Sequence, residues 1–152
     1  MRISAKVDYA VRAMCELAAH QGELPLKAEQ IAACQEIPLS YLENILVDLR
    51  RAGFVRSLRG QVGGYRMAKP ASAITVADVI RAVEGPLAEV RGIRPEAVTF
   101  PGSAAALRDV WLATRVSLRR VLERVSIADI VDGGLAPDVA ALLDDPDALV
   151  PH

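Results

Sequence analysis

One short stretch of the chain, residues 39–52, combines helical spacing with side chains that can contact the edges of DNA bases. Its apolar residues recur every three or four positions, which predicts a helix with one buried face. At about 100° per residue, the opposite face carries polar or small side chains: Ser40, Asn44, Val47 and Arg51, with Glu43 and Asp48 on its flanks. Amide and guanidinium groups donate to base edges, a carboxylate accepts from cytosine, and valine can contact a thymine methyl. The chemistry that this face suits is recognition of a nucleic-acid sequence.

A basic, glycine-rich segment follows directly. Gly53 ends the predicted helix, and residues 54–59 and 65–68 predict two strands joined by a turn over residues 60–64. Gly60, Gly63 and Gly64 permit positive φ and close approach of the backbone to a phosphate. Between Leu49 and Ala77 there are six basic residues and no acidic one: Arg50, Arg51, Arg56, Arg59, Arg66 and Lys69. A polyanion is therefore the expected partner.

The order of these elements distinguishes two interpretations. A basic run by itself is typical of a solvated hairpin on any small domain. Here a short helix, residues 27–34, and a turn, residues 35–38, precede the base-reading helix, and the hairpin follows it. Helix, turn, helix and glycine-tipped hairpin make up a winged helix-turn-helix. The predicted fold class is therefore mainly α with a small β-hairpin wing, and the predicted partner is double-stranded DNA.

The rest of the chain predicts a support for this head and a second functional element. Residues 4–20 predict a first helix, and Thr75 with Asp78 predicts the capped start of a fourth, so residues 1–84 form the expected DNA-binding domain.

Residues 85–102 read as a loop, and Ser103 is expected to cap a helix of about 23 residues. Its apolar stripe, with one threonine, consists of Leu107, Val110, Trp111, Thr114, Leu118, Val121 and Leu122. We expect this helix to form a homodimer; the alternative is a long core helix within one subunit. A short helix should complete residues 103–132, and residues 133–152 form an acidic tail expected to be frayed.

Charge and composition narrow the class of protein. Residues 1–70 carry 10 basic and 7 acidic side chains, a net of +3, and residues 71–152 carry 8 and 12, a net of −4. The basic part would face nucleic acid. Because the chain has no long apolar run and no leader pattern, we expect a cytoplasmic protein without a membrane partner. Its two histidines form no zinc motif, and residues 60–64 lack the lysine of a phosphate-binding loop, so we do not expect an enzyme.

Several motifs resemble one family. They are Met-Arg-Ile-Ser at residues 1–4, Tyr-Ala-Val-Arg-Ala-Met from Tyr9, Leu-Ser-Tyr-Leu-Glu from Leu39, Leu-Arg-Arg-Ala-Gly-Phe-Val from Leu49 and Arg-Gly-x-x-Gly-Gly-Tyr-Arg from Arg59. Over residues 1–132 the chain resembles bacterial winged-helix regulators of the Rrf-two family, of the IscR and NsrR type. The resemblance implies a homodimer that binds imperfect palindromes in promoters, usually as a repressor.

The resemblance also implies roles for individual residues. By this likeness, Ser40, Tyr41, Glu43 and Asn44 begin the recognition helix, and Arg59, Gly60, Gly63 and Gly64 form a wing that enters the minor groove. Arg51 and Tyr65 complete the predicted DNA-binding set. Val62 stands at a wing-tip position that is often glycine in the family; the neighbouring glycines should still permit the turn.

Sensing members of the family hold an iron–sulfur cluster through three cysteines in the loop before the long helix. Residues 85–102 contain no cysteine, and the chain has only Cys15 and Cys34, so we expect no cofactor and no metal site. Asp8 stands where one relative supplies an acidic ligand, and a site shared across the dimer from Asp8 or Cys15 stays open. A small-molecule pocket near Trp111, oxidation of either thiol, and a dimer that mainly docks a protein effector stay open as well.

Overall fold

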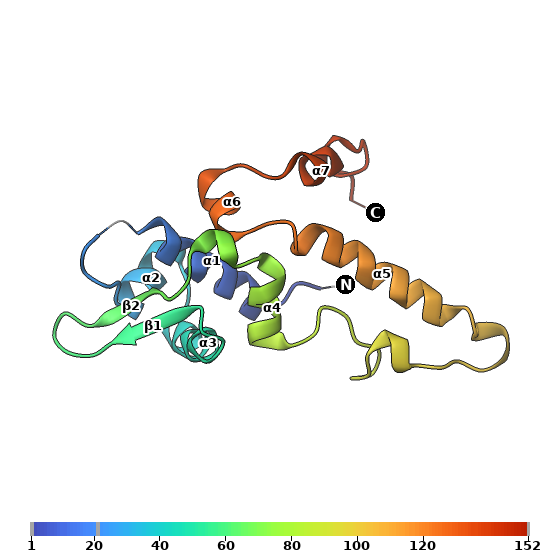
Figure 1. Ribbon diagram of the computed structural model, residues 1–152, viewed down its shortest axis with the longest axis horizontal. Helices are drawn as coiled ribbons and strands as arrows, with labels where there is room; N and C mark the ends of the chain where they lie inside the picture. The colour runs from blue at the N-terminus through green and yellow to red at the C-terminus, as the bar shows by residue number, and fades with distance from the viewer. Residues whose placement is uncertain (1, 21, 152) are drawn as a thin grey trace.

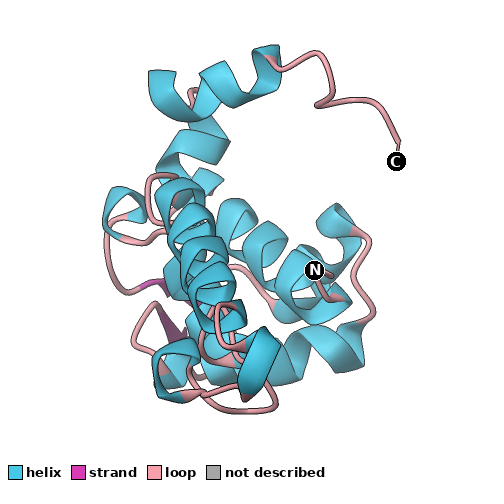
Figure 2. Cartoon of the chain, turned by 90° about the vertical axis from the view of Figure 1, so that its right-hand side faces the viewer, coloured by secondary structure: helices cyan, strands magenta, loops and turns pink. Residues whose placement is uncertain are grey.

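The computed structural model describes residues 2–20 and 22–151, and helices make up most of it (Figures 1 and 2). Met1 and Gln21 of the predicted head, and His152 of the predicted tail, lie outside the described residues. The elements in chain order are α1 Ala5–Ala19, α2 Ala28–Gln35, α3 Leu39–Arg51, β1 Val55–Leu58, β2 Gly64–Met67, α4 Val76–Glu84, α5 Leu107–Leu122, α6 Ile127–Asp132 and α7 Pro137–Ala140. Short 3₁₀ helices lie at Ala71–Ala73, Pro95–Ala97, Gly102–Ala104 and Ala141–Asp144. The predicted fold class, mainly α with a small hairpin, is confirmed.

Helix α1 is the centre of the head, and α2, α3, α4 and α6 all pack against it (Figure 1). Its start is capped by Ser4, whose Oγ accepts a hydrogen bond from the amide of Val7 at 3.1 Å. Its apolar side chains form an inward stripe: Val7, Ala10, Met14 and Leu17 are buried, and Val11 and Ala18 are partly buried. The predicted face of α3 is buried too, with Leu42, Ile45, Leu46 and Leu49 in the same core. Burial of these two faces leaves the predicted base-reading face of α3 directed outward.

The turn between α2 and α3 has a strained residue and a buried anchor. Helix α2 ends one residue later than predicted, at Gln35, and Glu36 takes the left-handed conformation, with φ 52°. Its amide donates to the carbonyl of Ala32, which closes the end of α2. The next side chain, Ile37, is buried in the core. The hydrogen bond to Ala32 and the buried side chain of Ile37 together fix the turn, and so fix the angle between α2 and α3.

Strands β1 and β2 pair antiparallel in the register Val55↔Met67, Arg56↔Arg66, Ser57↔Tyr65 and Leu58↔Gly64. The predicted hairpin is therefore present, with a register that the sequence pattern did not define. One feature was not predicted: Leu26, just before α2, adds a bridge to Tyr65 through two backbone hydrogen bonds of 3.0 and 2.7 Å. This bridge ties the wing to the start of the helix-turn-helix.

Two adjacent capping boxes join the C-terminal part of the chain to the head. Thr75 and Asp78 cap α4 as predicted, and Ser126 and Asp129 cap α6 in the same way. The chain segments leading into these helices pair through hydrogen bonds of 2.9 Å, from Val76 N to Val125 O and from Ile127 N to Ile74 O. Ile127 is completely buried in the head core. The head therefore draws on residues far beyond position 84; where its domain boundary lies stays a prediction.

Helix α5 is shorter than predicted. It has 16 residues and begins at Leu107, and Ser103 is not its cap but part of the 3₁₀ turn Gly102–Ala104. The physical reason lies in the entry to the helix: Gly102 has φ +55° and Ala106, the residue before the helix, already has helical angles, so no extended capping residue precedes it. At the other end the helix stops at Leu122, and the carbonyl of Val125 accepts a hydrogen bond from the first residue of α4. Helix α5 extends away from the head (Figure 1).

The predicted loop contains one short turn, Pro95–Ala97, and is held by contacts with α5, whereas the predicted tail is more structured than expected. In the loop, Pro95 and Val98 are buried, and the guanidinium of Arg108 donates to the carbonyl of Glu96 at 3.3 and 3.4 Å. The expectation of a frayed tail is wrong for residues 137–144, which form α7 and a 3₁₀ turn. Val139 is buried, and Asp138 pairs with Arg124 at 3.1 Å, which together hold this segment in place. The sequence did not predict this, because nothing local distinguishes Val139 from the exposed apolar side chains of the same acidic segment.

Candidate nucleic-acid interface

The outward face of α3 presents most of the predicted base-reading side chains to solvent. Ser40, Tyr41, Glu43, Asn44 and Arg51 are all exposed. Val47, predicted to point outward with them, is half-buried instead. Because a residue must be free to reach a groove before it can contact a base, the exposed five remain the candidates and Val47 is a weaker one.

Local contacts hold several of these side chains in position. The Nδ2 of Asn44 donates to the carbonyl of Ser40 at 3.0 Å, so the amide lies along its own helix in the absence of DNA. The ring of Tyr41 meets that of Tyr9 edge-to-face at 6.3 Å between centroids. Asp48, the acid on the flank of this face, is paired with Lys6 at 2.8 Å. That ion pair offsets a negative charge which would otherwise repel phosphate.

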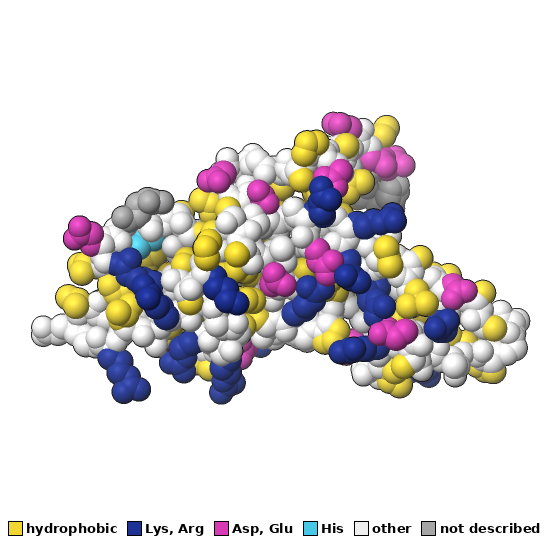
Figure 3. Space-filling view, viewed as in Figure 1, with side chains coloured by type: hydrophobic (Ala, Val, Ile, Leu, Met, Phe, Trp, Pro, Cys, Tyr) yellow, Lys and Arg dark blue, Asp and Glu magenta, His cyan; other side chains and the backbone are white. Residues whose placement is uncertain are grey.

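The wing concentrates positive charge on the same side of the head. Arg59 is exposed at its tip, and the register places Arg56 directly opposite Arg66. Like charges at opposite positions of a ladder destabilise it, and a bound anion relieves that repulsion. Figure 3 shows Lys and Arg side chains gathered along the lower left edge, over α3 and the hairpin, whereas Asp and Glu predominate at the upper right. This edge is therefore the surface best suited to a polyanion.

The wing glycines have two different structural roles. Gly60 needs its φ of +106°, which other residues rarely adopt. A Cβ on Gly63 would lie 2.4 Å from the carbonyl oxygen of Leu58, and one on Gly64 would lie 2.4 Å from that of Leu26. The close approach that these two glycines permit is thus to their own chain, and their part in phosphate contact stays a prediction. Tyr65, half-buried beside them, is held by its backbone bridge to Leu26.

Replacing Gly64 with Ala should loosen the wing. The added Cβ would meet backbone atoms that cannot move aside without breaking the Leu26–Tyr65 bridge, so we expect a loss of about 1–3 kcal/mol in the free energy of unfolding. Gly134→Ala is the matched control, because a Cβ at that position would have no atom within 4 Å and the φ of Gly134 is not positive. Urea unfolding of both variants measures the difference. Equal stability of the two would show that the close approach at Gly64 is not a constraint.

The side chains near the family's cluster position do not fit an iron–sulfur cluster. Among residues 2–20 and 22–151, no group of three or more His, Cys, Asp or Glu side chains could hold a metal ion. Cys15 is half-buried in α1, and burial, followed by the charge of Glu16, raises the pKa of its thiol. Cys34 is exposed on α2. Asp8 pairs with Arg12 at 2.9 Å, which makes it a neutralised surface charge.

The stripe predicted for dimerisation is open to solvent along α5. All residues of this helix are described and none is buried; Val110 is 53% exposed and Trp111 36%. The alternative of a long core helix within one subunit is therefore wrong. The hydroxyl of Thr114 donates to the carbonyl of Val110 at 2.9 Å, so this polar side chain does not interrupt the stripe. Thr114, Leu118, Val121 and Leu122 line a mainly apolar groove whose other walls come from α1 and the residues before it, α4 and the residues after it, and α6.

Comparison with known proteins identifies the family. Residues 3–133 match the Rrf2 family, described as iron-dependent transcriptional regulators. A Mycobacterium tuberculosis protein, Rv1287, named as a candidate regulator of the helix-turn-helix type, is 47% identical over 145 residues, covering 95% of this chain and 90% of the relative. The helix-turn-helix regulator CymR of Bacillus subtilis is 35% identical over 130 residues, covering 86% and 89%.

Solved structures agree with this assignment. The structure of CymR from B. subtilis, described as the global cysteine regulator, has a TM-score of 0.73 and 34% identity, covering 88% of this chain and 98% of that one. The structure of IscR from T. potens has a TM-score of 0.69 and 32% identity, covering 100% and 93%. Within the described residues, no helix combines the length and the apolar character that crossing a membrane requires. The resemblance seen in the motifs is confirmed, and the chain belongs to the Rrf2 family of DNA-binding transcriptional regulators, which are not enzymes.

Proposed function

We propose that this regulator works as a homodimer that binds an imperfect palindrome in promoter DNA and represses transcription from it. The observation that carries the proposal is the unpartnered apolar side of α5. A second copy of the chain is the occupant that fits it best, because a two-fold interface requires a self-complementary surface. Helix α5 supplies both a projecting apolar stripe and one wall of the apolar groove, so one copy's stripe meets the other's groove.

In this dimer the two heads face the same side of the duplex. A two-fold axis near α5 would place each α3 in a major groove, with half-sites spaced by about one helical turn or a multiple of it. Glu43 and Asn44 would select the sequence, with Ser40, Tyr41 and Arg51 beside them. Arg59 and the wing backbone at Gly60, Gly63, Gly64 and Tyr65 would hold the neighbouring minor groove and phosphates. A promoter occupied in this way is closed to polymerase, which is the basis of repression.

Two measurements on the full chain test this proposal. Sedimentation equilibrium should give a dimer at micromolar concentration. A gel shift with the DNA upstream of the protein's own coding region should show tighter binding than to the same DNA with its sequence shuffled, and addition of the protein should lower transcription from that promoter in vitro. A monomer, or equal affinity for both DNAs, would contradict the proposal.

We also propose that the regulator binds DNA without an iron–sulfur cluster, although its family is described as iron-dependent. A cluster needs about four ligands, overwhelmingly thiolates. The two cysteines lie on different helices, one of them half-buried, and the loop offers only Glu89 and Glu96, which are hard oxygen donors. Protein purified without oxygen should therefore be colourless and lack stoichiometric iron and sulfide, yet shift its operator. A red-brown protein with both elements bound would overturn this prediction.

A further inference from the structure

A second pocket adjoins the apolar groove on a neighbouring face of α5, between that helix, the end of α4 and the loop that follows it. It has a volume of about 470 Å³. Four arginines from three parts of the chain line it: Arg81 of α4, Arg94 of the loop, and Arg115 and Arg119 of α5. Its remaining wall is formed mainly by Gly85, Pro86, Leu87 and Ala88, which are neutral. Glu96 is the single acidic side chain in the lining.

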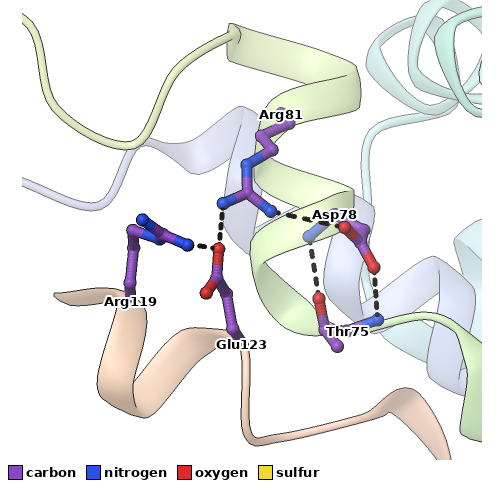
Figure 4. A network of polar contacts seen from close by, with 5 residues as sticks. All are labelled: Thr75, Asp78, Arg81, Arg119 and Glu123. Atoms are coloured by element: carbon purple, nitrogen blue, oxygen red, sulfur yellow. Dashed lines mark hydrogen bonds and ion pairs between the residues drawn. The ribbon is translucent and has the colours of Figure 1, made fainter. Parts of the chain in front are cut away.

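The carboxylates around this pocket are too few to neutralise the arginines. Glu123 is shared, because it pairs with Arg119 at 3.0 Å and also with Arg81 (Figure 4). Arg81 turns in addition toward Asp78, at 3.4 Å, whose other oxygen is already used in the cap of α4. Hydrogen bonds from Arg119 and then Arg81 lower the pKa of Glu123, so it is fully charged and still divided between two guanidinium groups.

The two other arginines have unused donors. Glu96 pairs with Arg115, but the Nε of Arg115 is buried without a hydrogen-bond partner. Within the described residues, the side chain of Arg94 makes no hydrogen bond and no ion pair. A buried donor left unsatisfied and a group of cations held close together both cost stability, and an anion placed between them would relieve both. Contacts within the chain therefore leave hydrogen-bond donors and positive charge in this pocket without partners.

We propose that this pocket binds a small organic anion that carries at least two carboxylate or phosphate groups. Guanidinium groups bind both kinds of oxyanion through paired, parallel hydrogen bonds. Because the arginines come from three separate elements, a ligand that engages them needs anionic groups at more than one point. The volume lies within the range of about 300–1,000 Å³ that is usual for small-molecule sites.

The position of the pocket gives such a ligand a route to DNA binding. Arg81 belongs to α4, which packs in the head, whereas Arg115 and Arg119 belong to α5. An anion held by both would replace Glu123 as the link between the two helices and fix the angle at which the head leaves α5. If α5 forms the dimer proposed above, that angle sets the spacing of the two recognition helices. This coupling rests on the proposed function, but binding of the anion does not.

Isothermal titration of the full chain without DNA tests the site, with pyrophosphate and citrate as probes and with ionic strength held constant by chloride. We expect saturable binding with a Kd below about 1 mM. Arg94→Gln and Arg115→Gln should each weaken it by at least about tenfold, since each removes a charged partner of the anion. Arg120→Gln, a matched change on the same helix at a residue outside the pocket lining, should leave it unchanged within about twofold.

Two results would overturn the proposal. One is no saturable binding of either probe. Another is binding that Arg94→Gln and Arg115→Gln leave intact, which would place the anions elsewhere, such as on the wing. If the probes do not bind and these variants also bind DNA more weakly, the pocket is a contact for DNA phosphate instead. Because the Arg94 side chain makes no hydrogen bond and no ion pair within the described chain, Arg94→Gln should fold normally, and circular dichroism verifies this. Failure of dimerisation would leave the titration readable, so the two proposals fail separately.

Discussion

Leu118→Asp is expected to convert the dimer into monomers and to abolish operator binding at concentrations where the wild type is bound. Leu118 lies in the apolar groove and is only half-buried in one protomer, so the substitution should leave the helical content unchanged. Because the proposed dimer is two-fold symmetric, its interface would bury two unpaired carboxylates, one from each protomer, and each would cost several kcal/mol of dimer stability. We expect the dimer dissociation constant to rise by at least about 100-fold.

The control for this variant is Val116→Asp. Val116 is on the same helix, is 42% exposed and lies on the opposite side from the stripe. The substitution Val116→Asp introduces the same charge outside the proposed interface, so the dimer dissociation constant and the gel shift of this variant should match those of the wild type. Sedimentation velocity measures the oligomeric state of the two variants, and gel shifts with the same operator DNA measure their binding. A Leu118→Asp protein that stays dimeric, or a Val116→Asp protein that dissociates equally, would show that the partner packs on another face of α5.

Asn44→Ala should weaken binding to the operator by about 1–3 kcal/mol and change binding to random DNA little. The amide of Asn44 is exposed, and its present hydrogen bond is to a helix carbonyl already used within α3, so little stability depends on it. Removing the Asn44 amide should therefore weaken binding only to DNA in which this amide contacts a base edge. Titrations on operator and shuffled DNA give the difference. Equal loss on both would mean that Asn44 positions the helix and reads nothing.

Arg59→Ala serves as the contrasting variant. Arg59 stands at the exposed tip of the wing, where a contact with phosphate or the minor groove carries little sequence information. Its removal should weaken operator and shuffled DNA alike and reduce the log–log slope of affinity against salt by about one. If Arg59→Ala weakened binding to the operator alone, the wing, and not only α3, would read the DNA sequence.

The sequence predicted the elements whose signal is periodic and local. The stripe of α3, the cap of α4 at Thr75 and the hairpin after Gly53 all lie where the pattern placed them, because each depends on residues within a few positions of one another. The outward side chains of α3 followed from the same periodicity. Val47 did not, because the packing of neighbouring elements decides how deeply one side of a helix is covered.

What the sequence could not predict depends on distant parts of the chain. Nothing local indicates that Leu26 pairs with Tyr65, or that Ile127 enters the head core. The start of α5 was misplaced because a serine before an apolar run resembles a cap, whereas the chain enters through a 3₁₀ turn. The arginine pocket was missed as well. Arg115 and Arg119, spaced by four residues and off the apolar stripe, were the available signal, but only the fold shows that Arg81 and Arg94 face them.

The central claim, that this protein reads a palindrome as a dimer, is tested most directly by selecting fragments of its own genomic DNA with the purified protein and sequencing those that are retained. Our account predicts that the retained fragments share an imperfect inverted repeat, with half-sites about one helical turn or a multiple of it apart, and that Asn44→Ala retains them poorly. Retained fragments that share no motif, or that share a single half-site without symmetry, would contradict it.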